Sequence, residues 1–141
     1  MTDREFITAV QEAGAFRTTK EAERAADAVL AELGASLRWG EAQILAARLP
    51  RRFGRLVLEQ SFTTSMGRFA PGILIARIAE REGVDRERAR HDLGAVLAAL
   101  DRLLPAGARE ELRAELPAAF AATVGPPPGP APAPAEPATA R

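Results

Sequence analysis

The chain of 141 residues has no cysteine and carries 19 basic and 19 acidic side chains, so its net charge is zero. The absence of cysteine excludes disulfides, thiolate catalysis and metal sites held by cysteine. Because the net charge is zero, only a local cluster of basic residues could attract nucleic acid. Hydrophobic residues make up 47% but aromatic residues only 5%, which predicts a folded body with an aliphatic core.

The first two predicted helices have clear start signals. Thr2 followed by Glu5 forms a capping-box pattern, and Phe6, Ile7 and Val10 then make one apolar face that is predicted to end at Gly14. The second helix is predicted to start at Thr18 and stop at Gly34. Its apolar face comprises Ala22, Ala25, Val29, Leu30 and Leu33.

Two shorter helices are predicted next. One follows Gly40 and carries Ile44, Leu45 and Leu49, and Pro50 fits the first turn of another that buries Phe53, Leu56 and Val57. Helices of this length are marginal in water. They must therefore pack against other parts of the chain.

The same order of residues then recurs. Val29 and Leu30 reappear 67 residues later as Val96 and Leu97, and Pro50 and Phe53 reappear as Pro117 and Phe120. We therefore predict an all-α fold made by tandem duplication of a four-helix unit, packed about a pseudo-twofold axis as a bundle of about eight helices. The first repeat covers residues 1–57, a linker 58–72, the second repeat 73–124 and a disordered proline-rich tail 125–141.

Three large apolar side chains occur in the linker. Phe62, Met66 and Phe69 would be sticky if exposed, so we expect them to pack against the body.

The chain contains the segments "EFITAVQEAG", "EAERAADAVLAELGASL" and "GEAQILAARLP", and weaker copies of them follow in the second half. In these segments the chain resembles a bacterial family known as domain of unknown function 2267. Gly40, Glu41 and Ala42 with Leu49 and Pro50 match the family signature, whereas the second copy has Gly107 and Ala108 where the signature has Gly-Glu. The resemblance implies an all-helical bacterial protein and supplies no catalytic residues.

No catalytic constellation is visible. His91 falls about 140° from the apolar position Val96 at 100° per residue, so it is expected to face solvent, where Glu87 could pair with it only weakly. Ser36, Ser61 and Ser65 have no nearby base. We predict neither an enzyme nor a metal or cofactor site.

Acidic and basic residues alternate between residues 80 and 90. This pattern is typical of a solvated helix face with i,i+4 ion pairs. The residues concerned are Glu80, Glu82, Asp85 and Glu87 with Arg81, Arg86, Arg88 and Arg90.

An arginine cluster is the sharper candidate for function. If the helices around Leu49 are nearly continuous, the cluster lies at i, i+3, i+4 and i+7 and lines one face. Its members are Arg48, Arg51, Arg52 and Arg55. Such a face is either simply solvated, or contacts a protein, or binds phosphate or nucleic acid. Trp39 is either a lid over the first repeat or an interface anchor.

We therefore predict a non-catalytic helical module for protein interaction or self-association, with nucleic-acid or anion binding through residues 48–55 as the alternative. No stretch of about 18 apolar residues occurs, and residues 1–10 lack the apolar core of a secretion signal. A cytoplasmic protein without a membrane partner is expected.

Overall fold

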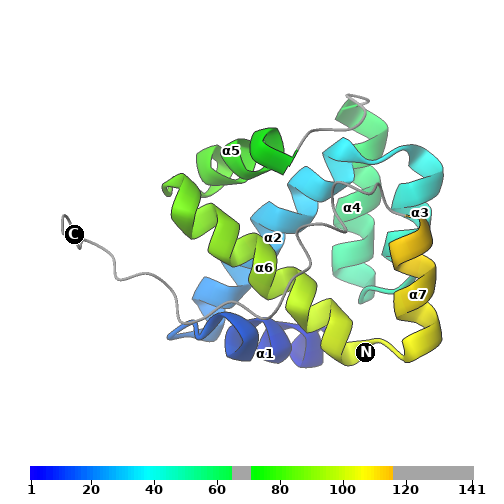
Figure 1. The fold of residues 1–141 in the computed structure, drawn as a ribbon, viewed down its shortest axis with the longest axis horizontal. Coiled ribbons are helices and arrows are strands. Elements are labelled where there is room, and N and C mark those ends of the chain that lie inside the picture. Colours follow the sequence, from blue (N-terminus) through cyan, green and yellow to red (C-terminus); the bar gives the residue numbers. More distant parts are fainter. Residues whose placement is uncertain (65–70, 116–141) are drawn as a thin grey trace.

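A computed structural model describes residues 1–64 and 71–115 and confirms an all-α fold, since the described residues form helices and no strands (Figure 1). Seven helices lie in this part of the chain. They are α1 (Asp3–Gly14), α2 (Thr19–Ser36), α3 (Trp39–Ala47), α4 (Arg51–Thr64), α5 (Pro71–Glu82), α6 (Arg86–Leu103) and α7 (Ala106–Glu115).

Side-chain caps fix the starts of three helices. The Thr2 hydroxyl accepts from the Glu5 backbone N–H at 3.1 Å while Thr2 N–H donates to the Glu5 carboxylate at 2.8 Å, which completes the predicted capping box. The Thr18 hydroxyl accepts from Glu21 N–H, and the Asp85 carboxylate accepts from Arg88 N–H. These bonds satisfy backbone donors that the helix itself leaves unpaired.

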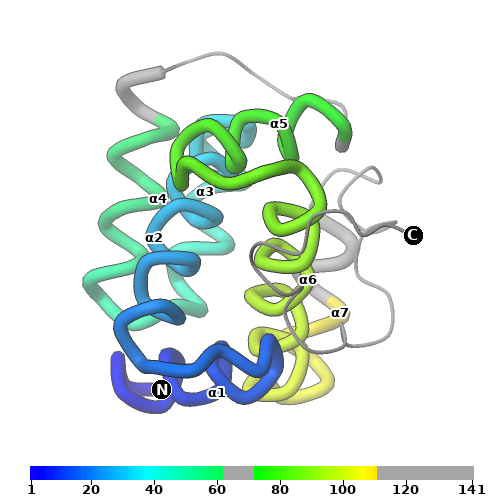
Figure 2. The backbone as a smooth tube through the Cα atoms, turned by 90° about the vertical axis from the view of Figure 1, so that its left-hand side faces the viewer, coloured from blue at the N-terminus to red at the C-terminus, as the bar shows by residue number. Residues whose placement is uncertain are grey.

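The two longest helices, α2 and α6, form the centre of the body. Figure 2 shows α1 crossing one end of this pair and α5 crossing the other, and both α1 and α5 contact both central helices. α4 packs along α2, and α3 packs against α4 and α7. The interface of α2 with α4 and α5 positions the site described below.

The core is aliphatic, as the composition predicts. All predicted core residues of α2 and α6 are buried, including Val29, Leu30, Val96 and Leu97. Phe6 of α1 and Phe53 of α4 are fully buried with ring centroids 5.0 Å apart in an edge contact. The periodicity of apolar residues therefore identifies the main buried face of α2 and that of α6 correctly.

Two glycines act differently from the prediction. α1 does end at Gly14, but the left-handed residue is Ala15, with φ of 52°. α2 does not stop at Gly34 but continues to Ser36. Gly34 instead lets α4 approach, because a Cβ there would lie 2.5 Å from the carbonyl oxygen of Val57.

Gly34→Ala is therefore expected to destabilise the protein by about 1–3 kcal/mol, because the new methyl group meets backbone that cannot move cheaply. Gly40 is the matched control, since a Cβ at this helical and exposed position meets nothing within 4 Å. Gly40→Ala is expected to stabilise by up to about 1 kcal/mol. Urea unfolding measures both, and equal effects would refute the close approach.

The segment between α4 and α5 is shorter than the linker predicted for residues 58–72. α4 continues to Thr64 and α5 begins at Pro71, so parts of residues 58–72 are helical. The positions of Phe62, Met66 and Phe69 side chains lie outside the described residues, as do the predicted eighth helix around Phe120 and the tail 125–141. In the described ranges 1–64 and 71–115, no helix combines the length and apolar character needed to cross a bilayer.

Candidate functional site

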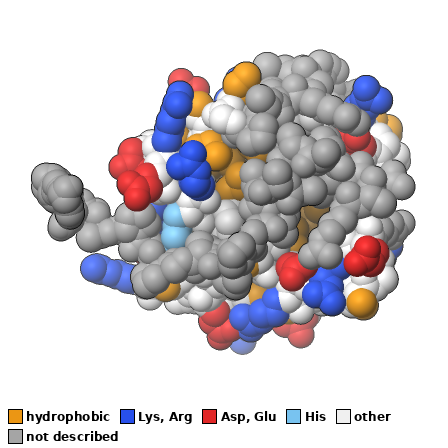
Figure 3. Space-filling model, viewed as in Figure 1, with side chains coloured by type: hydrophobic (Ala, Val, Ile, Leu, Met, Phe, Trp, Pro, Cys, Tyr) orange, Lys and Arg blue, Asp and Glu red, His pale blue; other side chains and the backbone are white. Residues whose placement is uncertain are grey.

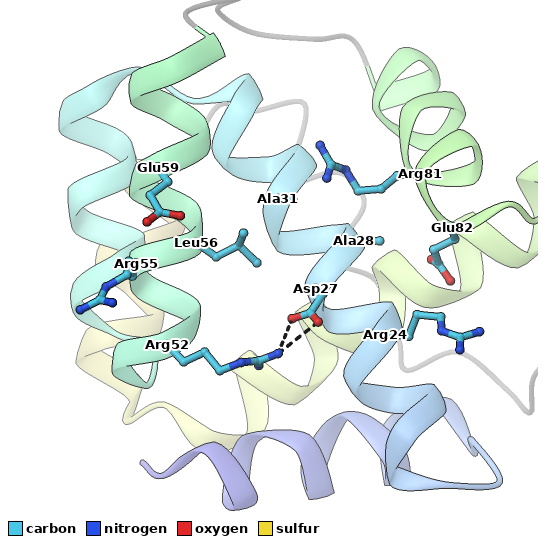
Figure 4. Close-up of a pocket in the computed structure, with 10 residues that line it drawn as sticks. All are labelled: Arg24, Asp27, Ala28, Ala31, Arg52, Arg55, Leu56, Glu59, Arg81 and Glu82. Atoms are coloured by element: carbon cyan, nitrogen blue, oxygen red, sulfur yellow. Dashed lines mark hydrogen bonds and ion pairs between the residues drawn. The ribbon is translucent and has the colours of Figure 1, made fainter.

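A groove of about 480 Å³ lies between α2, α4 and α5 (Figure 4). Its apolar lining consists of Ala28 and Ala31 from α2 and Leu56 from α4. Four arginines from three helices surround this lining: Arg24, Arg52, Arg55 and Arg81. We call this feature the arginine groove.

Two of these arginines hold the walls of the groove together. The Arg52 guanidinium of α4 donates to both Asp27 oxygens of α2 at 3.0 and 3.1 Å and lies 3.0 Å from Glu23. Burial raises the pKa of Asp27 above its ordinary value, and the Arg52 charge offsets part of this shift. Arg52 therefore has carboxylate partners within the protein.

The opposite wall is fixed by a buried carboxylate. Glu32 of α2 is 3% exposed, and its two oxygens accept from Arg77 Nε at 3.0 Å and from Arg81 Nε at 2.7 Å, both on α5. One buried negative charge thus binds two arginines one helical turn apart. This contact ties α5 to α2 across the groove.

The other two arginines are differently placed. Arg24 on α2 and Arg55 on α4 are exposed, and neither side chain forms an ion pair with the residues that the structure describes. Figure 4 shows them on different sides of the groove, with no interaction drawn to either. Their charges are available to a ligand.

The structure brings together only part of the predicted arginine cluster. The condition of a near-continuous helix is not met, because α3 ends at Ala47 and α4 begins at Arg51. Arg52 and Arg55 line the groove, whereas half-buried Arg48 and exposed Arg51 do not. Trp39 is 47% exposed at the start of α3 and also lies outside the groove lining.

His91 is not a surface residue, contrary to the prediction. It is 8% exposed, because α1 packs across the face of α6 that carries it. Its Nε2 lies 2.9 Å from the Gly14 carbonyl oxygen and its Nδ1 lies 2.8 Å from Asp92 Oδ1. The Phe16 ring contacts the imidazole edge-on with centroids 5.4 Å apart.

The charged run at residues 80–90 is only partly a solvated face. Glu82 at the end of α5 and Arg88 on α6 are half-buried, because the chain turns at Gly83 and brings the two helices together. Arg88 Nε donates to Asp92 Oδ1 at 3.1 Å. Elsewhere in the run, Glu80 and Glu87 are exposed as expected.

Glu82 joins the arginine groove to this buried cluster. Its carboxyl lines the groove and also faces the carboxyl of Asp92, which is fully buried. Desolvation first, and then the hydrogen bond and charge of Asp92, raise the pKa of Glu82 from 4.5 to about 9. Glu82 is therefore neutral at pH 7.

The raised pKa makes stability depend on pH. Between about 4.5 and about 9 the folded protein holds the Glu82 proton and the unfolded chain does not. The contribution of this proton to the free energy of unfolding is complete below about pH 4.5 and is lost as the pH rises through about 9. Glu82→Gln mimics the protonated state, so its Tm is expected to fall by about 10–20 °C less than that of the wild type between pH 6 and 9. Parallel Tm profiles from circular dichroism would contradict the neutral carboxyl.

Figure 3 shows basic and acidic side chains interspersed on the face viewed there, without an extended patch of one sign. Within the two described ranges, no group of three or more histidine, aspartate or glutamate side chains is arranged to hold a metal ion.

Comparison with known proteins places the chain in a family. A family model described as "Uncharacterized conserved protein (DUF2267)" matches residues 3–123, which is most of the chain. The chain belongs to the DUF2267 family. Among curated proteins, no match was found.

The arginine groove of this DUF2267 protein was missed by sequence reasoning because its residues come from three separate helices. One signal was present in the sequence. Arg24, Ala28 and Ala31 fall at i, i+4 and i+7, so they share a side of α2 that is distinct from the large apolar residues. An arginine beside small residues on one helix face indicates a surface that another element can approach closely.

Proposed function

We propose that this DUF2267 protein is a non-catalytic interaction module that binds an acidic segment of a partner protein in the arginine groove. The observation that carries the proposal is the pair Arg24 and Arg55, which flank an apolar floor without an ion-pair partner among the described residues. Buried apolar surface and unpaired cations together suit an amphipathic ligand with carboxylates at its edges.

The floor favours a helical or extended peptide over an isolated ion. Ala28 and Ala31 are only 5% and 1% exposed, so half-buried Leu56 supplies most of the apolar contact that remains open in the groove. Arginine forks bind carboxylates in a planar, bidentate way. An acidic segment would therefore gain both burial and directional hydrogen bonds.

Nucleic-acid binding is the alternative, and the groove supports it less. Asp27 and Glu59 line the same groove as the arginines, and among the described residues of the lining no aromatic side chain occurs to stack on a base. Four phosphate contacts would also give a log-log salt slope of only about −3 to −4.

A non-catalytic role is supported by the hydroxyl groups. Ser36 Oγ donates to the Leu33 carbonyl at 2.8 Å, and Ser61 Oγ donates to the Leu37 carbonyl at 3.0 Å. Both serines are buried and bonded to backbone rather than to a base. Ser65 lies outside the described residues.

The duplication also remains our proposal, and the helix bounds support it. α6 and α7 begin 67 residues after α2 and α3, and α5 begins 68 residues after α1. α1 and α5 also take similar places at opposite ends of the α2–α6 pair (Figure 2). If the two halves are copies, both keep the same apolar residues, and the arginines of α4 are present in the first copy alone.

Peptide binding tests the function. The probe is a labelled synthetic helix of about 16 residues, about 24 Å long, with leucines on one face and glutamates beside them. We expect fluorescence anisotropy to show binding to the wild type, weakened about tenfold or more by Arg24→Glu with Arg55→Glu. Arg51→Glu, on the exposed side of α4 outside the groove, should change Kd by less than about twofold.

A circular dichroism spectrum and Tm for each variant separate lost binding from lost fold. Absence of peptide binding, or equal binding by the groove variant, would refute the proposal. Binding of a labelled oligo-dT probe that needs the same two arginines, with no peptide binding, would replace it by the nucleic-acid alternative.

A further inference from the structure

The Glu82 end of the arginine groove contains an unusual pair of carboxyl groups. Glu82 comes from the last turn of α5, and Figure 4 shows it near Arg24 of α2 at one end of the groove. On its other side Glu82 faces Asp92 of α6, which has no exposed surface.

Two buried carboxyl oxygens without a hydrogen-bond donor call for a proton in this cluster. Asp92 Oδ1 accepts from Arg88 Nε and contacts His91 Nδ1. Asp92 Oδ2 and Glu82 Oε2 are both buried, and neither has a donor when both carboxyls are ionised. A single proton shared by the pair satisfies both oxygens, whereas two ionised carboxylates would repel one another in a desolvated site.

In the part of the chain that the structure describes, the charged groups acting on Glu82 lie on α6 and α2. From α6 it faces Asp92 and Arg88, with His91 behind Asp92, and from α2 it faces Arg24. Arg88 donates a hydrogen bond to Asp92. From α1, the uncharged carbonyl of Gly14 contacts His91. Whether the Arg24 guanidinium is open to a ligand therefore depends on whether Glu82 is neutral or anionic.

We propose that the proton shared by Glu82 and Asp92 keeps Arg24 available for a carboxylate of the bound acidic segment, so that loss of this proton weakens binding. An anionic Glu82 would compete for Arg24 and would repel the ligand carboxylate at the same end of the groove. This inference rests on the proposed function and states that binding of the acidic segment depends on the protonation of Glu82.

Linkage fixes the direction of the effect. If deprotonation of Glu82 weakens binding, then binding of the segment must raise the affinity of Glu82 for its proton. The pKa of Glu82 in the free protein is about 9, so binding should weaken as pH rises through that value. Ligand glutamates and all arginines keep their charge over this range.

The test measures Kd of the labelled acidic helix at about pH 7.5 and about pH 10. Wild type is expected to bind about fivefold or more weakly at the higher pH, and Glu82→Gln to bind with the same Kd at both. Arg24→Gln should bind weakly at both values, because the group that Glu82 controls is absent. Equal pH profiles for the wild type and Glu82→Gln would overturn the inference while leaving the proposed function intact.

A second measurement tests the shared proton without any ligand. The ¹³C signal of the Glu82 carboxyl, followed in the free full-length protein, should titrate only above about pH 8. A transition near the ordinary value of glutamate, about 4.3, would overturn the inference. Lack of peptide binding at about pH 7.5 with an alkaline Glu82 transition would refute the proposed function, and with it the role of the proton in binding.

Discussion

Asp92→Ala is expected to destabilise the protein by about 3–5 kcal/mol. Asp92 is fully buried and joins three side chains: Glu82, Arg88 and His91. Removal of its carboxylate leaves the half-buried Arg88 without its anion and leaves His91 Nδ1 without a partner. Urea unfolding at pH 7, monitored by circular dichroism, measures the change.

Asp92→Asn is the matched control. The amide keeps the volume and an oxygen that accepts from Arg88 and contacts His91 Nδ1, while its NH₂ group donates to Glu82 in place of the shared proton. We expect a smaller loss than for alanine, together with a lower pKa for Glu82. An alanine variant within about 1 kcal/mol of the wild type would show that the buried cluster does not hold α5 and α6 together.

Leu30→Ala is expected to cost about 2–5 kcal/mol. Leu30 has no exposed surface and lies on α2, which packs against α1, α4, α5 and α6. The cavity left by the lost side chain cannot collapse easily when four helices surround it. The measurement is the free energy of unfolding from urea titration.

Ile73→Ala provides the comparison for Leu30, since Ile73 is 54% exposed near the start of α5. Its substitution should change stability by no more than about 0.5 kcal/mol. Similar losses at the two positions would contradict the assignment of α2 as the centre of the core.

The helices and their buried faces could be predicted because the signals are local. Thr2 and Thr18 cap helices where the sequence predicts, and apolar residues at helical spacing identify the core. Glycines were misinterpreted where their role depends on a neighbouring helix. Gly34 resembles a stop signal in sequence, but its small size serves the contact with Val57.

The environment of His91 could not be predicted for a similar reason. Its angle from Val96 indicates solvent if α6 has a single buried face. α6 has more than one buried face, because α1 and α5 both pack on it from different ends of the body (Figure 2). Single-helix periodicity does not reveal which helices cover the second face.

The arginine groove shows the same limit. Arg52 and Arg55 stand out in the sequence, but the charges of Asp27 and Glu23 beside Arg52 become evident only when α2 lies against α4. Which arginines hold the walls of the groove and which are open to a ligand is therefore decided by the tertiary structure.

The most direct test of the central claim is to locate the bound acidic helix by NMR. In a ¹⁵N–¹H titration of the full chain, the backbone amides of Ala28, Ala31 and Leu56 should shift most, and the Trp39 indole N–H should stay unchanged. Largest shifts at Trp39 or along α7, with the groove amides unmoved, would contradict the assignment of the arginine groove as the binding site.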